Sequence, residues 1–365
     1  MRYSINTDSI TIYELFNEEL DIKLISNYSK LIFSYYFDQY VSVIPSTITH
    51  LTFGYEFNQD VSKLPQNLNY LKFGNDFNQN VSFLPNFLTH LIFGYEFNQD
   101  VSNLPVGLTH LTFGYKFKQN TSKLPKSITH LTLYCSFIEY TLDLPQTITH
   151  LIFNGWFWCN AGYLPRGITH LTFSGSLSGV YTNLWNLPPT ITHLTFSDSF
   201  NEDVSYLPRT LTHLTFGKNF RRKVTNLPHG LTHLTFGYNF NQDVSELPQT
   251  LTHLTFGAKF NRKVSKLPKT LTHLIFGKYF NQNISKLPSS LTHLTLGLDF
   301  KQECDIPLNI KYLELNCNNQ YIIDSLPNSV IELKLNMEFN LQMDNLPSSI
   351  KKIMIHPYGS YDKDL

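Results

Sequence analysis

Histidine is the residue type in this chain whose number and spacing could do chemistry. Twelve of its 14 histidines stand in the tripeptide Thr-His-Leu, and most of them recur every 20 residues. Imidazole can act as a general base, as a proton acceptor near neutral pH or as a ligand for zinc and nickel. The twelve are His50, His90, His110, His130, His150, His170, His193, His213, His233, His253, His273 and His293. Any role given to one of them has to account for the other copies as well.

Three interpretations of these histidines compete. A catalytic base needs one distinct residue that a partner group orients, whereas these are equivalent copies. A metal site needs further ligands, but the neighbouring outward positions are mostly threonine, and no Asp, Glu or Cys completes a ligand set. We therefore predict no catalytic residue, no metal site and no cofactor, and we interpret the row as an exposed histidine ladder along a sheet. A scaffold that responds to pH or metal through this ladder is kept as an alternative.

A ladder of this kind makes a prediction about pH. Neighbouring imidazoles would lie about one strand spacing apart, roughly 5 Å, and would repel each other when protonated. Folding should therefore lower the pKa of each histidine, and the protein should lose stability below about pH 6.

The elements that hold the histidines follow from a repeat marked by proline. The unit reads L-P-x-x-[LI]-T-H-L-T-F-G-x-x-F-N-Q-x-V-S-x, and its prolines begin with Pro45 and Pro65. The alternation in Thr-His-Leu-Thr-Phe predicts a half-buried strand with Leu51 and Phe53 facing inward and His50 facing outward. One such unit cannot bury its apolar face alone, so successive units must stack through parallel strand pairing.

The repeat unit resembles the FNIP repeat, a short relative of the leucine-rich repeat, over residues 23–356. The fold we expect is a β-rich solenoid: a leucine-rich-repeat-like right-handed superhelix of about 17 coils of 20 residues with one parallel β-sheet. Residues 1–22 should form a degenerate N-terminal coil or cap, and residues 23–303 the regular repeats. Residues 304–365 should form divergent C-terminal repeats and a cap.

The resemblance also implies protein–protein interaction and no chemistry. We therefore predict a non-enzymatic repeat scaffold for a protein partner, without a small-molecule substrate. Some members of the family carry an F-box, which recruits a ubiquitin ligase, before their repeats, and residues 1–22 are too few for that domain. The corresponding alternative is a substrate-recognition component that works with a ubiquitin ligase supplied by another chain.

The repeat is least regular at residues 154–187, which contain all three tryptophans. Tryptophan is enriched at the hot spots of protein interfaces. The competing interpretation is local repacking, in which a tryptophan fills space left by Ala161 and Gly162. The partner-binding candidates are Trp156, Trp158, Trp185 and Tyr181.

Two further patterns concern the turns. The Asn of Phe-Asn-Gln predicts a second ladder that satisfies backbone groups of the turns. Residues 204–290 contain twelve Lys and Arg against two Asp and Glu. This excess fits a solvated loop edge or an acidic protein partner, while nucleic acid would also require aromatic platforms. The asparagines are Asn58, Asn78, Asn98, Asn201, Asn241, Asn261 and Asn281.

The composition of the chain limits which partners and compartments we expect. The formal net charge is zero, which provides no global attraction to nucleic acid or to a membrane. No apolar run has the length of a signal peptide or a spanning helix, and the four cysteines show no paired spacing. We expect an intracellular protein, cytoplasmic or nuclear, with no membrane partner.

Overall fold

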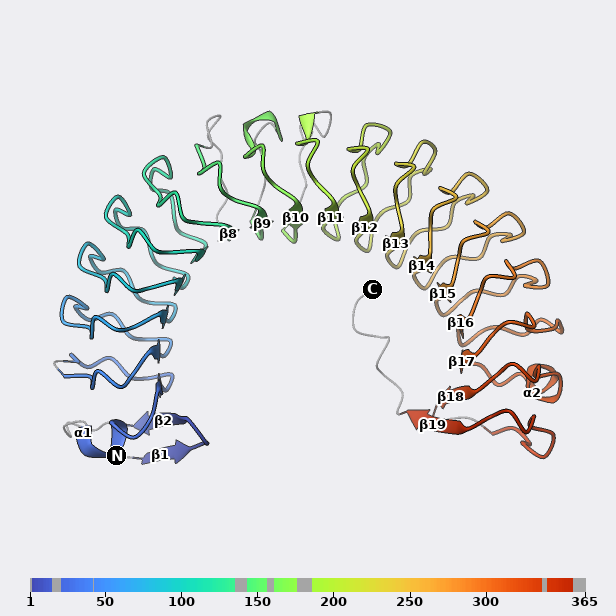
Figure 1. The fold of residues 1–365 in the computed structure, drawn as a ribbon, viewed down its shortest axis with the longest axis horizontal. Helices are drawn as coiled ribbons and strands as arrows, with labels where there is room; N and C mark the ends of the chain where they lie inside the picture. Colours follow the sequence, from blue (N-terminus) through green and yellow to red (C-terminus); the bar gives the residue numbers. More distant parts are fainter. Residues whose placement is uncertain are drawn as a thin grey trace. The chain divides into compact units, whose positions relative to one another are not determined.

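The fold is the predicted parallel β-solenoid, with about 16 turns that repeat every 20 residues along the chain. The chain forms two compact units, the first containing strands β1 to β10 and the second β11 to β19 (Figure 1). The computed structural model describes residues 2–14, 21–41, 43–134, 143–155, 161–175, 186–336 and 340–356.

Each coil contributes one short strand. In the first unit the elements are β1 (Arg2–Ile5), β2 (Ser9–Glu14), α1 (Ile22–Ile25), β3 (Lys30–Phe33), β4 (His50–Thr52), β5 (Tyr70–Lys72), β6 (His90–Ile92), β7 (His110–Phe113), β8 (His130–Leu133), β9 (His150–Phe153), the 3₁₀ turn η1 (Ala161–Tyr163) and β10 (His170–Phe173). In the second unit they are β11 (His193–Thr195), β12 (His213–Thr215), β13 (His233–Thr235), β14 (His253–Thr255), β15 (His273–Ile275), β16 (His293–Leu296), β17 (Tyr312–Leu315), α2 (Gln320–Asp324), β18 (Glu332–Asn336) and β19 (Lys352–His356).

Parallel pairing places equivalent residues of successive coils side by side. From β2 to β10 and from β11 to β19, each strand pairs in parallel with the next one in the same unit. His233 pairs with His253, for example, and Leu234 pairs with Leu254. The repeat pattern did not predict β1, which pairs antiparallel with β2 beside the first parallel pair.

The core of each coil consists of the residues that the repeat pattern turned inward. Leu251, Leu254, Phe256, Phe260 and Val264 of one coil are all buried. Two phenylalanines of a coil stack on each other, with ring centroids 3.7 Å apart between Phe256 and Phe260. Burial of each such side chain contributes roughly 1.5–3 kcal/mol, so the stability of a coil depends on its neighbours covering both faces.

Successive coils lie closer together at the sheet than at the turns. The ring centroids of His253 and His273, on the strand face, are 4.1 Å apart. The equivalent spacing is 6.1 Å for Phe260 and Phe280, which lie nearer the turns. Within a unit, the coils therefore fan outward from the strand face, and grooves open between the turns.

The glycine that follows the strand is required by a close backbone contact. A Cβ atom on Gly237 would lie 2.2 Å from the carbonyl oxygen of Gly217 in the preceding coil. Tyr134, Asn154 and Ser174 occupy the equivalent position in the coils around the irregular zone. Their N–H groups instead donate to the carbonyl at the end of the preceding strand, at 3.1, 2.7 and 2.8 Å. The parallel ladder is one residue longer there, with Phe113 paired to Leu133 and Phe153 paired to Phe173.

Candidate functional site

The twelve histidines begin twelve of the strands, and the structure stacks eleven of them in two rows. In the first unit, neighbouring rings from His90 to His170 have centroids 4.1 Å apart. In the second unit, from His193 to His293, the corresponding distances are 3.8 to 4.1 Å. Tyr70 separates His50 from the first row, with centroids 5.6 Å away from His50 and 6.2 Å away from His90. The rings are closer than the strand spacing of about 4.8 Å, because the strand face is the narrow side of the fan.

A threonine orients each of these rings. The Oγ1 atom of the preceding threonine lies 2.9 Å from Nδ1 in all twelve Thr-His pairs. In the second unit, Thr252 also donates to the carbonyl oxygen of Thr232 at 3.2 Å. A hydroxyl has one hydrogen and a carbonyl can only accept, so Oγ1 of Thr252 accepts from Nδ1–H of His253. The hydrogen-bond network thus assigns the Nδ1–H tautomer and leaves the lone pair of Nε2 without a role in the ladder.

The environment of the row keeps its imidazoles neutral. Burial, followed by the imidazoles of His273 and His233, lowers the pKa of His253 from 6.5 to about 4. The sequence predicted this direction from repulsion alone, but the structure makes desolvation the larger cause, because the stacked rings are half-buried. Burial is likewise the first cause that lowers the pKa of His50, His110, His130, His150, His233, His273 and His293.

The stacking does not suit a metal ion. The ring planes of His233 and His253 are inclined by 12° with centroids 4.1 Å apart. An imidazole binds a metal through a lone pair in its ring plane, and lone pairs of nearly parallel stacked rings do not converge on one ion. Among the described residues, no group of three or more His, Cys, Asp or Glu side chains could hold a metal.

The predicted asparagine ladder is present at the turns. Oδ1 of Asn58 accepts from the backbone N–H of Asn78 at 2.9 Å, and Asn78 accepts from Asn98 in the same way. In the second unit, Asn241 accepts from Asn261, and Asn261 accepts from Asn281, both at 3.0 Å. Each amide oxygen therefore satisfies a turn N–H of the next coil, and the amide NH2 group is left facing away from that bond.

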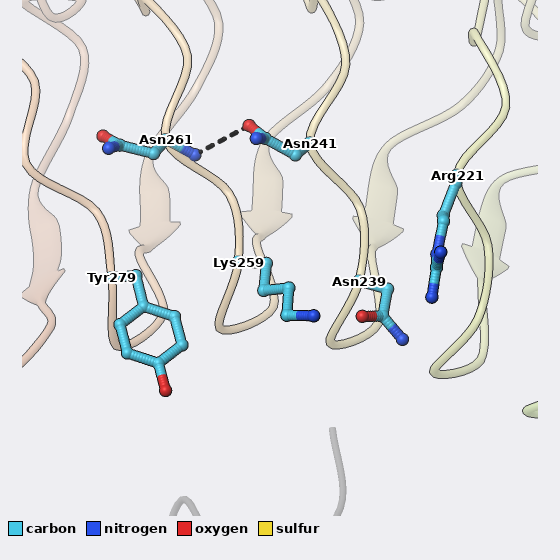
Figure 2. A pocket seen from close by; sticks show the side chains of 6 residues that line it. All are labelled: Arg221, Asn239, Asn241, Lys259, Asn261 and Tyr279. Carbon is cyan, nitrogen blue, oxygen red and sulfur yellow. Dashed lines mark hydrogen bonds between the residues drawn. The ribbon is translucent and has the colours of Figure 1, made fainter.

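A pocket of about 410 Å³ opens between the fanned turns of the second unit. We call it the basic groove; it is lined by Arg221, Asn239, Asn241, Lys259, Asn261 and Tyr279. Figure 2 shows these side chains on successive coils, with Asn241 and Asn261 joined by the ladder bond. The positive charge of this region is visible in the sequence, but the groove was not predicted from it. Arg221, which stands in the place of the ladder asparagine, was a signal that could have indicated it.

The comparison with known families settles the nature of the repeat. The FNIP Repeat family model matches residues 41–76, 57–96, 77–116, 97–136, 185–219, 223–259, 243–279, 260–299, 280–318, 300–337 and 318–358. The chain belongs to the FNIP repeat family. Within the FNIP repeat unit, the histidine rows lie on the strand, and the basic groove lies beside the Phe-Asn-Gln turn.

Two solved structures have similar folds, and one of them is a leucine-rich-repeat protein. The circular leucine-rich-repeat protein CroV588 is 34% identical to this FNIP chain, with a TM-score of 0.82. The match covers 97% of this chain and 60% of CroV588, so this chain spans well under two thirds of that protein's length. The structure of the Toll–Spatzle complex of Drosophila matches at 12% identity and a TM-score of 0.54, over 92% of this chain and 50% of that one. No curated protein matches this FNIP chain by sequence.

The remaining candidates of the sequence analysis are not placed by the structure. Trp156, Trp158, Trp185 and Tyr181 lie outside the described residues, so their role in partner binding stays a prediction. Within the described part of the FNIP chain, no helix is both long and apolar enough to cross a membrane.

Proposed function

We propose that this FNIP chain is a non-enzymatic scaffold that binds a protein partner. The repetition of its strand face supports this most directly. Every one of the twelve histidines meets its threonine at the same 2.9 Å, so none of them is set apart as a catalytic base would be. A long row of equivalent half-buried side chains provides a broad, rigid surface of the kind that repeat proteins use for binding.

The contact region that we propose for this partner is the irregular zone at residues 154–187. Trp156, Trp158 and Trp185, with Tyr181, would supply its aromatic anchors, since interface hot spots are rich in Trp and Tyr. The strand before this zone also departs from the repeat, because Asn154 takes the place of the turn glycine. Because the other coils are nearly identical, a partner that binds at one place must recognise residues that differ from the repeat.

The test is a quantitative affinity purification with three forms of the full chain. The first is the native chain, and the second has residues 154–187 rewritten to the consensus coil. The third has residues 281–300 rewritten to consensus as a control for the rewriting itself. A captured protein is then purified, and its direct binding to each form is measured by calorimetry.

We expect one saturable partner that binds the native and control chains and is lost with the rewritten zone. Retention of that partner by the rewritten chain would move the contact elsewhere on the solenoid. An F-box protein among the captured chains would support the alternative of a ubiquitin-ligase component. Absence of any directly binding protein, or turnover of a substrate by the native chain, would overturn the scaffold function.

A further inference from the structure

We propose that the basic groove of the second unit binds an extended acidic segment of the protein partner. The inference rests on the proposed function, and it adds the chemistry of the partner and a second contact site. The groove belongs to the stretch that carries twelve Lys and Arg against two Asp and Glu. Its lining includes two cations and the amides of Asn241 and Asn261, which are hydrogen-bond donors suited to carboxylates. The amide of Asn239 already donates to Oδ1 of Asn219 at 3.0 Å, and the phenol of Tyr279 is hydrogen-bonded to Tyr238.

The amide groups of the groove are oriented by the ladder. Oδ1 of Asn241 is occupied by the N–H of Asn261, at 3.0 Å. Oδ1 of Asn261 accepts from the N–H of Asn281 and from Nε2 of Gln282, both at 3.0 Å. The opposite end of each amide is its NH2 group, and neither NH2 donates to another described residue. The groove therefore presents two amide donors in fixed positions on adjacent coils.

The cations of the groove are also available. Arg221 takes the ladder position that asparagine holds in the next coils, and its backbone N–H donates to Oδ1 of Asn201 at 2.8 Å. Among the described residues, the guanidinium of Arg221 has no carboxylate partner, and neither has the ammonium of Lys259. The backbone N–H of Lys259 donates to the carbonyl oxygen of Tyr238 at 2.9 Å. This bond fixes the point on the turn from which the lysine side chain extends.

Asp243, one of the two acidic residues of the basic stretch, is already engaged. Oδ1 of Asp243 accepts from the N–H of Ser245 at 3.2 Å, and Oδ2 accepts from its hydroxyl at 2.7 Å. At the far end of the groove, the hydrogen bond with Tyr238 raises the pKa of Tyr279, and the carboxylate of Asp299 on the next coil adds to this effect. The positive potential at Arg221 and Lys259 is thus not cancelled within the groove.

The spacing of the groove selects an extended chain. In the core behind it, the ring centroids of Phe240, Phe260 and Phe280 on successive coils are 6.1 Å apart. Alternate side chains of an extended peptide are about 6.6 Å apart. A peptide lying across the coils would therefore offer one side chain to each coil, with acidic groups facing Arg221 and Lys259. A single phosphate fits less well, because it needs donors that converge on one point.

Nucleic acid would use aromatic rings in and beside the groove as stacking platforms. The ring that lines the groove, Tyr279, already has Nζ of Lys278 5.3 Å from its centroid. The ring of Tyr238 already carries two cations, with Nζ of Lys218 and of Lys259 at 5.6 and 5.4 Å from its centroid. Those ammonium groups occupy the positions that a base would need. The same rings are therefore better suited to hold lysines in place for carboxylates.

The first unit supplies a natural contrast at the same positions of the repeat. Where the groove has Asn239 and Lys259, the equivalent residues of the first unit include Glu56, Asp76 and Glu96. The amide ladder behind them is the same. The one lysine at this position among the neighbouring coils of the first unit, Lys116, is paired with Glu96 at 2.8 Å. We therefore expect the acidic segment to bind the second unit and not the first.

The experiment measures fluorescence anisotropy of a labelled nine-residue peptide of alternating Glu and Thr against the full chain. Arg221→Glu/Lys259→Glu reverses the two groove cations. Lys266→Glu/Lys286→Glu makes the same change of net charge at exposed turns outside the groove. Arg221→Asn removes one cation while restoring the residue of the ladder, so it should fold at least as well as the native chain.

We expect the groove double variant to weaken binding about tenfold, Arg221→Asn several-fold, and the control less than about twofold. A permuted peptide with its five Glu contiguous should bind more weakly than the alternating one. If the two double variants lost peptide affinity equally, the binding would depend only on the net charge of the chain, and the groove would not be the site. Inorganic phosphate or oligo(dT) should not displace the labelled peptide as effectively as the unlabelled peptide does. Displacement as effective by either one would contradict a site for an acidic peptide.

The same variants separate this site from the scaffold function. If the purified partner still binds Arg221→Glu/Lys259→Glu with native affinity, the groove is not its contact and the scaffold function stands. If no partner binds any form of the chain, the scaffold function fails, whatever the peptide does.

Discussion

The hydroxyl of Thr252 lies 2.9 Å from Nδ1 of His253, and it also donates to the preceding coil at 3.2 Å. This one side chain joins the sheet backbone to the histidine row. It explains why Thr precedes every ladder histidine, because Thr provides a β-favouring side chain and a hydroxyl that bridges two coils. The bond also sets which ring nitrogen carries the proton, and several predictions depend on that relationship.

The stability of the protein should fall as the solution is acidified. The pKa of His253 in the folded state is about 4, against 6.5 for the ordinary group. A lowered folded pKa means that the stabilisation is fully present above pH 6.5 and is lost as the pH falls toward 4. Calorimetric Tm values at pH 7.5, 6.5, 5.5 and 4.5 should decrease in that order.

Tyrosine is the matched control for this pH effect. Tyr312 stacks on His293 with centroids 4.2 Å apart, so the row already accepts a tyrosine. The triple variant His233→Tyr/His253→Tyr/His273→Tyr should lose less stability between pH 7.5 and 4.5 than the native chain. An identical pH profile for the two proteins would assign the acid sensitivity to other groups.

Removal of the bridging hydroxyl should change the tautomer of the next histidine. Thr252→Val keeps the shape of the side chain but loses the acceptor for Nδ1–H of His253 and the donor for Thr232. We expect a loss of about 1 kcal/mol in the free energy of unfolding. Nitrogen-15 NMR of the imidazole should show Nδ1–H for His253 in the native chain and a shift toward Nε2–H in the variant. An unchanged nitrogen spectrum would show that the threonine does not set the tautomer.

Gly237, a turn glycine between two regular coils, should tolerate no side chain. Gly237→Ala would place a Cβ 2.2 Å from the carbonyl oxygen of Gly217, and the backbone must shift to relieve the contact. We expect a loss of about 1–3 kcal/mol in urea unfolding. Gly230→Ala is the control, because its nearest atom would be 3.6 Å away, an ordinary contact. Equal stability of both variants would mean that the coils can separate freely.

The asparagine ladder should require an acceptor oxygen and not an amide as such. Asn261→Ala leaves the N–H of Asn281 without its partner, which should cost about 1–2 kcal/mol in unfolding free energy. Asn261→Asp should lose less, because Asp38 already accepts from the N–H of Asn58 at 2.8 Å in the first unit. Similar losses in the two variants would contradict the role of the oxygen.

Most of the coil could be predicted from its pattern. The alternation in Thr-His-Leu-Thr-Phe placed Leu254 and Phe256 in the core and His253 outside, and the ladder of Asn241 and Asn261 followed from the stacking of equal positions. The hairpin strand β1 could not be predicted, because it belongs to no repeat and its pairing with β2 depends on contacts at the end of the stack. The groove was missed because it is a space between coils and not a property of one coil.

The sequence by itself determined the repeat, the strand, the inward residues and the order of like side chains along each row. It could do so because a period of 20 residues leaves one way to bury the apolar positions, which is to stack coil on coil. Only the tertiary structure decided the distances: 4.1 Å between His253 and His273, and 6.1 Å between Phe260 and Phe280. That fan buries the imidazoles, which lowers their pKa, and it opens the turns, which creates the basic groove. Both effects depend on how coils pack against one another, and no single coil carries that information.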